Sequence, residues 1–198
     1  STLAYNRARA GGGLHHFGGN LSLTNSTISQ NDATDNGGGL YNGGSAVLSF
    51  ATLNANQADG DGGNLFNDEA QLSIESSLVA QAQAGGNCFN SDGFLTSLGY
   101  NLESSNTCNF TATGDLINVD PLLGPLQNNG GPTPTHALLD GSAALDHGSA
   151  TCPATDQRGV VRPQGLACDS GAYEFATIAD LAITASVAPP TVTVGARV

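Results

Sequence analysis

The chain has 198 residues, with 27 glycines, a formal net charge of −12 and no lysine among its basic residues. A surface this acidic excludes a protein that holds nucleic-acid phosphates, and the lack of a long apolar run in the sequence excludes membrane insertion. This glycine content without a collagen period favours many tight turns, and hence a repeat fold.

Two independent series of residues recur about every 25 positions over residues 1–108. In the first series, Gly-Gly-Gly or Gly-Gly-Asn precedes an apolar residue, at Leu14, Leu40, Leu65 and Cys88. The second series has strict steps of 25 and comprises Thr2, Thr27, Thr52 and Ser77, then Asn6, Asn31, Asn56 and Gln81, then Ala8, Ala33 and Ala58. Together the two series define four turns of one unit.

Short alternating segments within each unit are typical of strands with one buried face, for example Leu21 with Leu23 and Leu72 with Ile74. A unit of three short strands cannot bury its own apolar face, but stacked units can, at an inter-strand spacing of about 4.8 Å. We therefore predict an all-β fold, a right-handed parallel β-helix over residues 1–108. The alternative is a β-sandwich with coincidental glycines, which the agreement of the two series disfavours.

Stacking turns each repeated position into a column of side chains. The leucines of the first series are expected inside the β-helix. Asn6, Asn31 and Asn56 are expected to pair their amides along the stack, with Gln81 continuing this ladder.

Residues 109–176 break the repeat and contain six prolines, which favour irregular coil and edge strands. A solenoid needs a terminal element that hides its open edge and its apolar interior. We therefore predict that residues 109–176 form an irregular, disulfide-bearing C-terminal cap.

Five short motifs follow one another in this region. They are NNGGPTPTHALL at 128–139, GSAALD at 141–146, CPATDQRG at 152–159, RP at 162–163 and CDSGAYE at 168–174. They resemble the choice-of-anchor Q domain family of bacterial secreted β-helix proteins, and the coils resemble the pectin-lyase-like body of the same proteins. Asp140 stands where that family commonly has proline. The resemblance implies a secreted, surface-attached protein and no settled activity.

Residues 177–198 alternate like two strands around Pro189 and Pro190. They resemble the start of the Ig-like repeats of large bacterial surface proteins, and the alternative is a disordered linker. Since Ser1-Thr2-Leu3 matches Ser26-Thr27-Ile28, the chain also begins within a coil. We expect both ends to continue in a longer polypeptide.

The four cysteines allow three disulfide pairings. Local pairing would close one loop within a coil and one within the cap motif, which favours Cys88–Cys108 and Cys152–Cys168. Each bond would contribute about 3 kcal/mol in the chain-entropy description. Disulfides indicate an oxidising compartment, in agreement with an extracellular or cell-surface location. No Cys-x-x-Cys pair supports a zinc site.

Asp59 and Asp61 place two carboxylates on one glycine-rich turn, a ligand type that Ca²⁺ prefers. The segment lacks the rest of an EF-hand loop, and the same composition simply makes a turn. Calcium is the one cofactor that the sequence suggests, and it stays an alternative to a turn without metal.

An aromatic strip is expected where His15, Tyr41 and Phe66 stack on successive coils, beside a column begun by His16. Such a strip can stack on sugar rings, and its alternative is an aromatic ladder that supports the fold. A polysaccharide or another cell-surface ligand is therefore the partner that the sequence suggests.

Catalysis is disfavoured by the distribution of the charged residues. Most acidic residues of the coils sit in turns rather than in a facing pair, as a glycosidase requires. β-Helix lyases use a basic residue as proton acceptor, whereas Arg7 and Arg9 are the only basic residues of the coils and both lie in a turn. Arg158 and Arg162 are expected to hold carboxylates such as Asp156 and Asp169, or backbone carbonyls.

Three functional hypotheses follow. The leading one is a non-enzymatic, structural or adhesive segment of a large secreted bacterial protein. The second is a polysaccharide lyase or glycoside hydrolase whose active coils lie outside this sequence. The third is a subunit that self-associates through its coil ends or its C-terminal tail into a filament.

Overall fold

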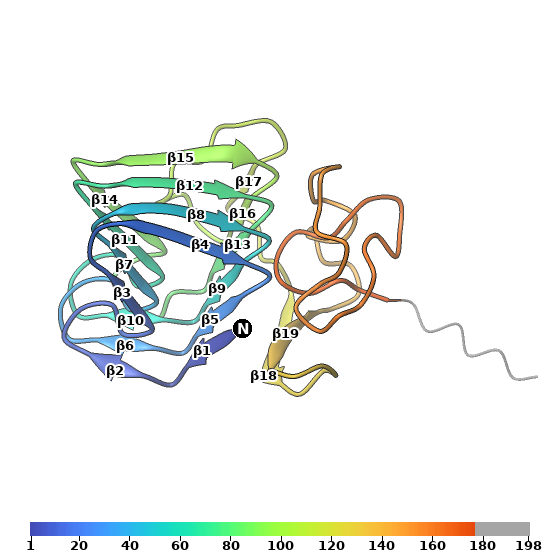
Figure 1. Cartoon of the computed structure of the whole chain (residues 1–198), viewed down its shortest axis with the longest axis horizontal. Helices are drawn as coiled ribbons and strands as arrows, with labels where there is room; N and C mark the ends of the chain where they lie inside the picture. Colours follow the sequence, from blue (N-terminus) through green and yellow to red (C-terminus); the bar gives the residue numbers. More distant parts are fainter. Residues whose placement is uncertain (177–198) are drawn as a thin grey trace, which may run out of the picture.

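The computed structural model describes residues 1–176. It confirms the predicted fold class, since the described residues form parallel strands stacked into a β-helix of about four turns, without helices (Figure 1). The predicted Ig-like segment, 177–198, lies outside the described residues.

Four parallel sheets form the sides of the β-helix. Sheet A contains β1 (Thr2–Ala4), β5 (Thr27–Ser29), β9 (Thr52–Asn54), β13 (Leu78–Ala80), β16 (Leu102–Glu103) and β17 (Leu116–Ile117). Sheet B contains β2 (Arg7–Ala8), β6 (Asp32–Ala33) and β10 (Gln57–Ala58). Sheet C contains β3 (Leu14–His16), β7 (Leu40–Asn42), β11 (Leu65–Asp68) and β14 (Cys88–Ser91). Sheet D contains β4 (Asn20–Thr24), β8 (Ser45–Ser49), β12 (Gln71–Glu75) and β15 (Phe94–Gly99).

The strand register confirms most of the predicted columns. The apolar series pairs Leu14 with Leu40, Leu40 with Leu65 and Leu65 with Cys88. The alanines of the second series also pair on successive coils. These columns fill the interior with aliphatic side chains, and the leucines at positions 40 and 65 are fully buried. Burial of this kind contributes most of the stability of a fold whose single coils have no core.

The strict step of 25 fails at the fourth coil. Thr52 pairs with Leu78 rather than with Ser77. The cause is one extra residue between β11 and β12. Residues 68–70 separate Asn67 from Gln71, whereas only residues 43–44 separate their partners Asn42 and Ser45 on the preceding coil. The strict spacing of 25 residues therefore predicted Ser77 at the position that Leu78 occupies.

The asparagine ladder is confirmed for three coils and is wrong for Gln81. Asn6 donates to Asn31 and Asn31 donates to Asn56, at 3.0 and 2.9 Å. From there the ladder continues through Asn64 and Asn87, at 2.8 and 2.9 Å. Gln81 lies at an exposed corner instead, because the extra residue brings it beneath Ala55.

The predicted cap has two parts, and the first closes the end of the stack. Cys108 and Phe110 are buried in the β-helix core, next to the end formed by β15 and β17 (Figure 1). The buried carboxylate of Glu103 holds this segment by accepting hydrogen bonds from Thr107 N and Cys108 N. Hydrogen bonds from several N–H and O–H donors offset the cost of burying a carboxylate.

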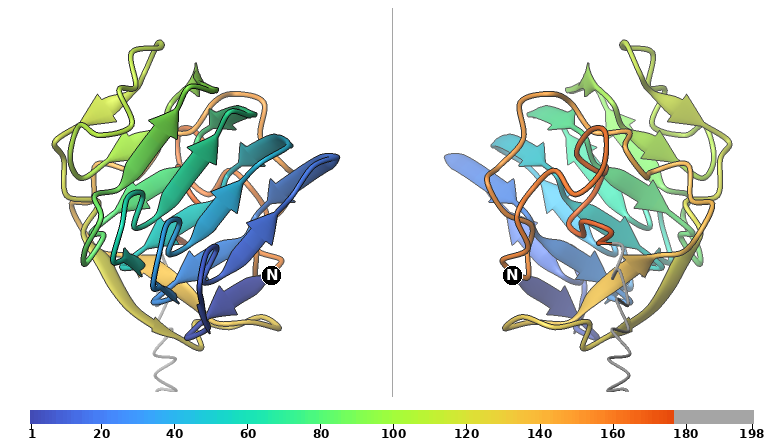
Figure 2. Two further views of the ribbon diagram at one scale, coloured as in Figure 1. Left: turned by 90° about the vertical axis from the view of Figure 1, so that its left-hand side faces the viewer. Right: turned by 90° about the vertical axis from the view of Figure 1, so that its right-hand side faces the viewer.

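The second part lies along the side of the β-helix. Residues 118–176, called the strap below, run over the outer face of sheet A (Figures 1 and 2). The strap includes the antiparallel pair β18 (Leu123–Gln127) and β19 (Thr135–Leu138). A second apolar cluster joins the strap to the coils through Leu78, Leu102, Leu138 and Ala144.

Candidate functional site

The strap covers the outer face of sheet A and leaves the outer faces of sheets B, C and D uncovered (Figures 1 and 2). The residues that bend the chain from sheet A into sheet B are Tyr5, Gln30, Ala55 and Gln81 on successive coils. All four have left-handed backbone, with φ of 59°, 56°, 56° and 53°. This shared conformation makes a sharp corner and directs four side chains outward in one column.

A second column runs beside the corner. Arg7, Asp32 and Gln57 are aligned on sheet B, and the backbone N–H of Gln83 continues the pattern by bonding to Asn56 O. Because Ala55 has the shortest side chain of the corner column, a hollow of about 420 Å³ opens there. We call this hollow the amide groove, and it is lined by Tyr5, Gln30, Asn31, Asp32, Ala55, Gln57 and Gln83.

A second hollow, of about 500 Å³, lies between sheets B and C. Its polar and aromatic lining residues are Arg9, His15, Asp35, Asn36 and Tyr41. It therefore contains two members of the predicted sugar-contact strip.

The predicted aromatic strip exists as a continuous ladder. His15 lies against Tyr41 with ring centroids 4.7 Å apart, and Tyr41 stacks on Phe66 at 5.2 Å. Phe66 in turn stacks on Phe89 at 5.4 Å. Phe66 is only 6% exposed, and the ring faces inside the ladder are covered by their neighbours. The ladder can therefore offer ring edges, and a free face only near its ends.

Polar contacts fix the edges of this ladder. Tyr41 donates its hydroxyl hydrogen bond to Asp68, and this bond raises the pKa of Tyr41 to about 12. His16 begins a separate column, as predicted, with Nδ1 2.7 Å from Asn42 Oδ1. Asn42 then donates to Asn67, so His16 is engaged in an internal polar ladder.

The predicted calcium pair is exposed at the corner between sheets B and C. Asp59 and Asp61 lie on either side of Gly60, whose N–H bonds to Asp35 O. Within residues 1–176, no three His, Cys, Asp or Glu side chains form a group suited to hold a metal. The two carboxylates therefore stay a predicted pair without a third ligand of these kinds.

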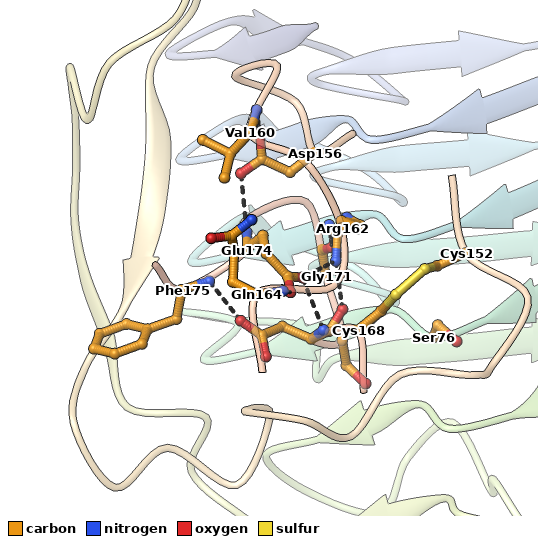
Figure 3. Close-up of polar contacts among 12 residues, drawn as sticks. Ser76, Cys152, Asp156, Val160, Arg162, Gln164, Cys168, Gly171, Glu174 and Phe175 are labelled. Atoms are coloured by element: carbon orange, nitrogen blue, oxygen red, sulfur yellow. Dashed lines mark hydrogen bonds and ion pairs between the residues drawn. A yellow bond between two sulfur atoms is a disulfide. The ribbon is translucent and has the colours of Figure 1, made fainter. Parts of the chain in front are cut away.

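Both predicted disulfides are present, Cys88–Cys108 and Cys152–Cys168. The first joins sheet C to the segment that closes the end of the stack. The second lies within the strap, where Figure 3 shows it near Arg162 and Ser76. The four described arginines each have an acidic partner: Arg7–Asp32, Arg9–Asp35, Arg158–Asp156 and Arg162–Glu174.

The strap arginines bond to carboxylates and to backbone carbonyls, as predicted. Arg158 pairs with Asp156 at 2.8 Å, as expected. Arg162 pairs with Glu174 at 2.9 Å (Figure 3). It also donates to the backbone carbonyls of Asp169 and Gly171, but not to the carboxylate of Asp169. In the described part of the chain, no cation bonds directly to the carboxylate of Asp169. Burial is therefore the largest influence on this group and raises its pKa to about 6. These arginines thus stabilise the strap rather than form a surface site.

A serine–histidine pair that sequence reasoning missed lies between the strap and sheet A. Ser29 Oγ is 2.9 Å from His136 Nε2, and His136 Nδ1 is 2.7 Å from Gly124 O. Burial lowers the pKa of His136 and favours the neutral ring. In this form Nδ1 donates a hydrogen bond to Gly124 O, and Nε2 accepts one from the Ser29 hydroxyl. Both side chains are buried, so a substrate cannot reach the hydroxyl in this arrangement, and the pair fastens the strap.

Comparison of the chain with protein-family models, with curated proteins and with solved structures finds no match. Among residues 1–176 there is also no helix with the length and apolar character needed to cross a membrane.

Proposed function

We propose that this chain is a rigid, adhesive segment of a secreted bacterial surface protein, and that it acts by contact with carbohydrate rather than by turnover. The observation that carries the proposal is the pair of open hollows beside sheet B, lined by exposed aromatic and amide side chains on a heavily cross-linked body. Aromatic faces and amides are the groups that bind sugars without chemistry.

Rigidity is supported by three kinds of internal restraint. Two disulfides close loops of 20 and 16 residues in sequence separation. The buried asparagine ladder bonds successive coils, and the strap bonds to several of them at once. A body restrained in this way suits a stalk or spacer outside the cell, where disulfides persist.

The resemblance to the choice-of-anchor Q family points the same way, because it implies a secreted, surface-attached protein. The arginines of the coils add a chemical argument. Arg7 and Arg9 are each paired with an aspartate, and a paired guanidinium is a poor proton acceptor. This disfavours lyase chemistry on these coils.

The extracellular part of the proposal is tested by non-reducing mass spectrometry of protein isolated from its natural source. Peptides linked through Cys88–Cys108 and Cys152–Cys168 are expected. Four free thiols in that sample would rule out a secreted protein.

A second candidate, self-association, is supported by the first coil. The strands β1 to β4 are terminal in their sheets, and Leu3, Leu14, Leu21 and Leu23 are only partly buried there. Where this coil forms the end of the stack, its unpaired strand edges can pair with another chain. Electron microscopy tests the idea: filaments that disappear when residues 177–198 are deleted support assembly, and monomers at high concentration oppose it.

A further inference from the structure

Tyr5 is a largely exposed aromatic residue beside the amide groove. Its side chain is 70% exposed and lies at the first position of the corner column. Unlike Tyr41 and Phe66, it has no aromatic neighbour within residues 1–176. Its ring therefore presents a free face beside the amide groove, and a free aromatic face is what a sugar ring stacks on.

Three exposed glutamines line the rest of the groove. Gln30, Gln57 and Gln83 are all exposed and come from successive coils. Each carboxamide offers both a donor and an acceptor, which matches hydroxyl groups that also do both. Coils follow one another at about 4.8 Å, close to the length of one sugar unit in an extended polysaccharide. Gln57 and Gln83 occupy the same position on successive coils and therefore repeat along the β-helix axis at the scale of such a polymer, while Gln30 lies beside them at the corner of the preceding coil.

The charge of the groove restricts the ligand class. Its one carboxylate, Asp32, is paired with Arg7 at 3.2 Å, and its other lining residues are uncharged. The chain as a whole carries a formal charge of −12 and has no lysine. No unpaired cation of the described residues lines the groove, so a uronate or sulfated polymer would be repelled by the protein without local compensation.

From these observations we propose that the amide groove binds a neutral polysaccharide, which lies parallel to the β-helix axis, stacks on Tyr5 and bonds to Gln30, Gln57 and Gln83. The inference rests on the proposed carbohydrate contact and adds its location and its ligand class. It moves the main contact away from the predicted strip, whose inner ring faces are covered.

Two substitutions test the groove without disturbing the fold. Tyr5→Ala removes the stacking face, and alanine already occupies the same corner, with the same backbone conformation, at Ala55. Ala55→Gln fills the hollow, and glutamine already occupies that corner at Gln30 and Gln81.

Matched controls carry the same chemical changes elsewhere. Phe17→Ala removes an aromatic side chain that is 87% exposed outside the groove. Val47→Gln introduces the same glutamine on the exposed face of β8. Circular dichroism and thermal unfolding verify that all four variants of the full chain are folded.

Binding is measured by affinity electrophoresis of the full chain in gels that contain hydroxyethylcellulose, soluble mannan or laminarin, with polygalacturonate as the acidic comparison. We expect retardation by at least one neutral polymer, insensitive to salt because no charge is involved. Tyr5→Ala and Ala55→Gln should weaken it by about tenfold or more, the scale of truncating an aromatic anchor. The two controls should bind like the parent chain.

The other outcomes separate the inference from the proposed function. Neutral binding that survives both groove variants but is lost in Tyr41→Ala would overturn the groove and leave carbohydrate contact standing. Retardation by polygalacturonate alone would overturn the neutral ligand class. If no polymer in the panel retards the protein, both the groove and the proposed carbohydrate contact fail.

Discussion

Asp169 and Glu174 lie close together in the strap and are buried to a similar degree, but their partners differ. Glu174 accepts hydrogen bonds from Arg162 Nη1 and from two backbone N–H groups. Asp169 accepts only from the backbone, from Phe175 at 2.5 Å and Asp146 at 2.7 Å. Burial without a directly bonded cation raises the pKa of Asp169 from 3.8 to about 6.

This pKa predicts a pH dependence of stability. Because the folded state binds the proton of Asp169 more tightly than the unfolded state, its stabilising contribution is complete below about pH 4 and is lost as the pH rises through about 6. In Asp169→Asn this part of the pH dependence should disappear. It is measured by urea unfolding of both proteins across that range.

Two comparisons make the Asp169 result specific. His136 has the opposite sign, since its lowered pKa costs stability as the pH falls below 6.5, so only the difference between parent and variant is informative. Asp140→Asn removes an exposed carboxylate and should leave the pH profile unchanged. A profile that is the same for Asp169→Asn and the parent would contradict the buried, neutral form.

Single residues were predictable where they repeat and not where they are unique. The period identified Asn31 and Asn56 as ladder members because amides at matching positions stack. Nothing in the period indicated that a carboxylate, Glu103, would follow Leu53 and Val79 in an interior aliphatic column. A buried carboxylate at this position depends on the N–H donors of Thr107 and Cys108, which have no counterpart in the other coils.

At the scale of elements, the asparagine ladder joins the coils from within. Asn56 accepts hydrogen bonds from both the backbone and the side-chain amide of Asn31, each at 2.9 Å. It donates to Ile28 O and to Asn64 Oδ1. The ladder thus satisfies backbone groups at the bend of each coil, which would otherwise be buried without a partner.

Asn56→Ala should therefore destabilise the protein by about 3 kcal/mol, because it leaves several buried donors and acceptors unpaired. The matched control is Gln81→Ala. The repeat predicted Gln81 in the same ladder, but it is exposed, and its loss should change stability by less than about 0.5 kcal/mol. Urea unfolding measures both. Equal effects of the two substitutions would contradict the observed path of the ladder.

The same element shows why the register could be predicted only in part. Turn length is not constrained by the interior columns, since a longer turn bulges outward while the strands stay stacked. The turn before β12 uses this freedom, and Leu78 then takes the position predicted for Ser77. Leu78 and Val79 are both apolar, so the interior column that contains Leu53 gave no signal for the shift. The alternating residues of β12 did give one, since Leu72 and Ile74 lie 26 positions after Ala46 and Leu48.

At the scale of the whole molecule, the strap converts a stack of coils into one body. Gln157 illustrates this, because its side chain bonds to Thr27 on the second coil and to Thr2 on the first, both at 2.8 Å. It also bonds to Thr133 and Pro134 within the strap. The strap therefore contributes to the stability of coils far from it in the sequence.

Gln157→Ala should lower the stability of the whole chain by about 2 kcal/mol, because the buried hydroxyl of Thr27 and the half-buried hydroxyl of Thr2 each lose a hydrogen bond. Gln164→Ala is the control: it removes the same side chain from the same segment, where it bonds only to Val161 O and is exposed. Both are measured by urea unfolding with limited proteolysis. If Gln157→Ala frees the strap to protease without destabilising the coils, the strap is an independent attachment.

The place of the strap could not be predicted, for a physical reason. Many of its contacts with the coils join residues that lie far apart in the sequence, such as Ala172 with Thr52, and they follow no period. The amide groove shows the opposite case. Tyr5 and Gln30 directly precede two repeated asparagines, and the corner they share could have been found by reading one position before the ladder.

The function that we propose for this β-helix is to hold carbohydrate without changing it. The most direct test follows binding and turnover in one sample, with the full chain incubated with the neutral polysaccharide panel and polygalacturonate. Bound polymer should be recovered at its starting length, without new reducing ends and without the absorbance of unsaturated sugars. Shortened polymer or unsaturated product, dependent on the folded chain, would contradict the claim.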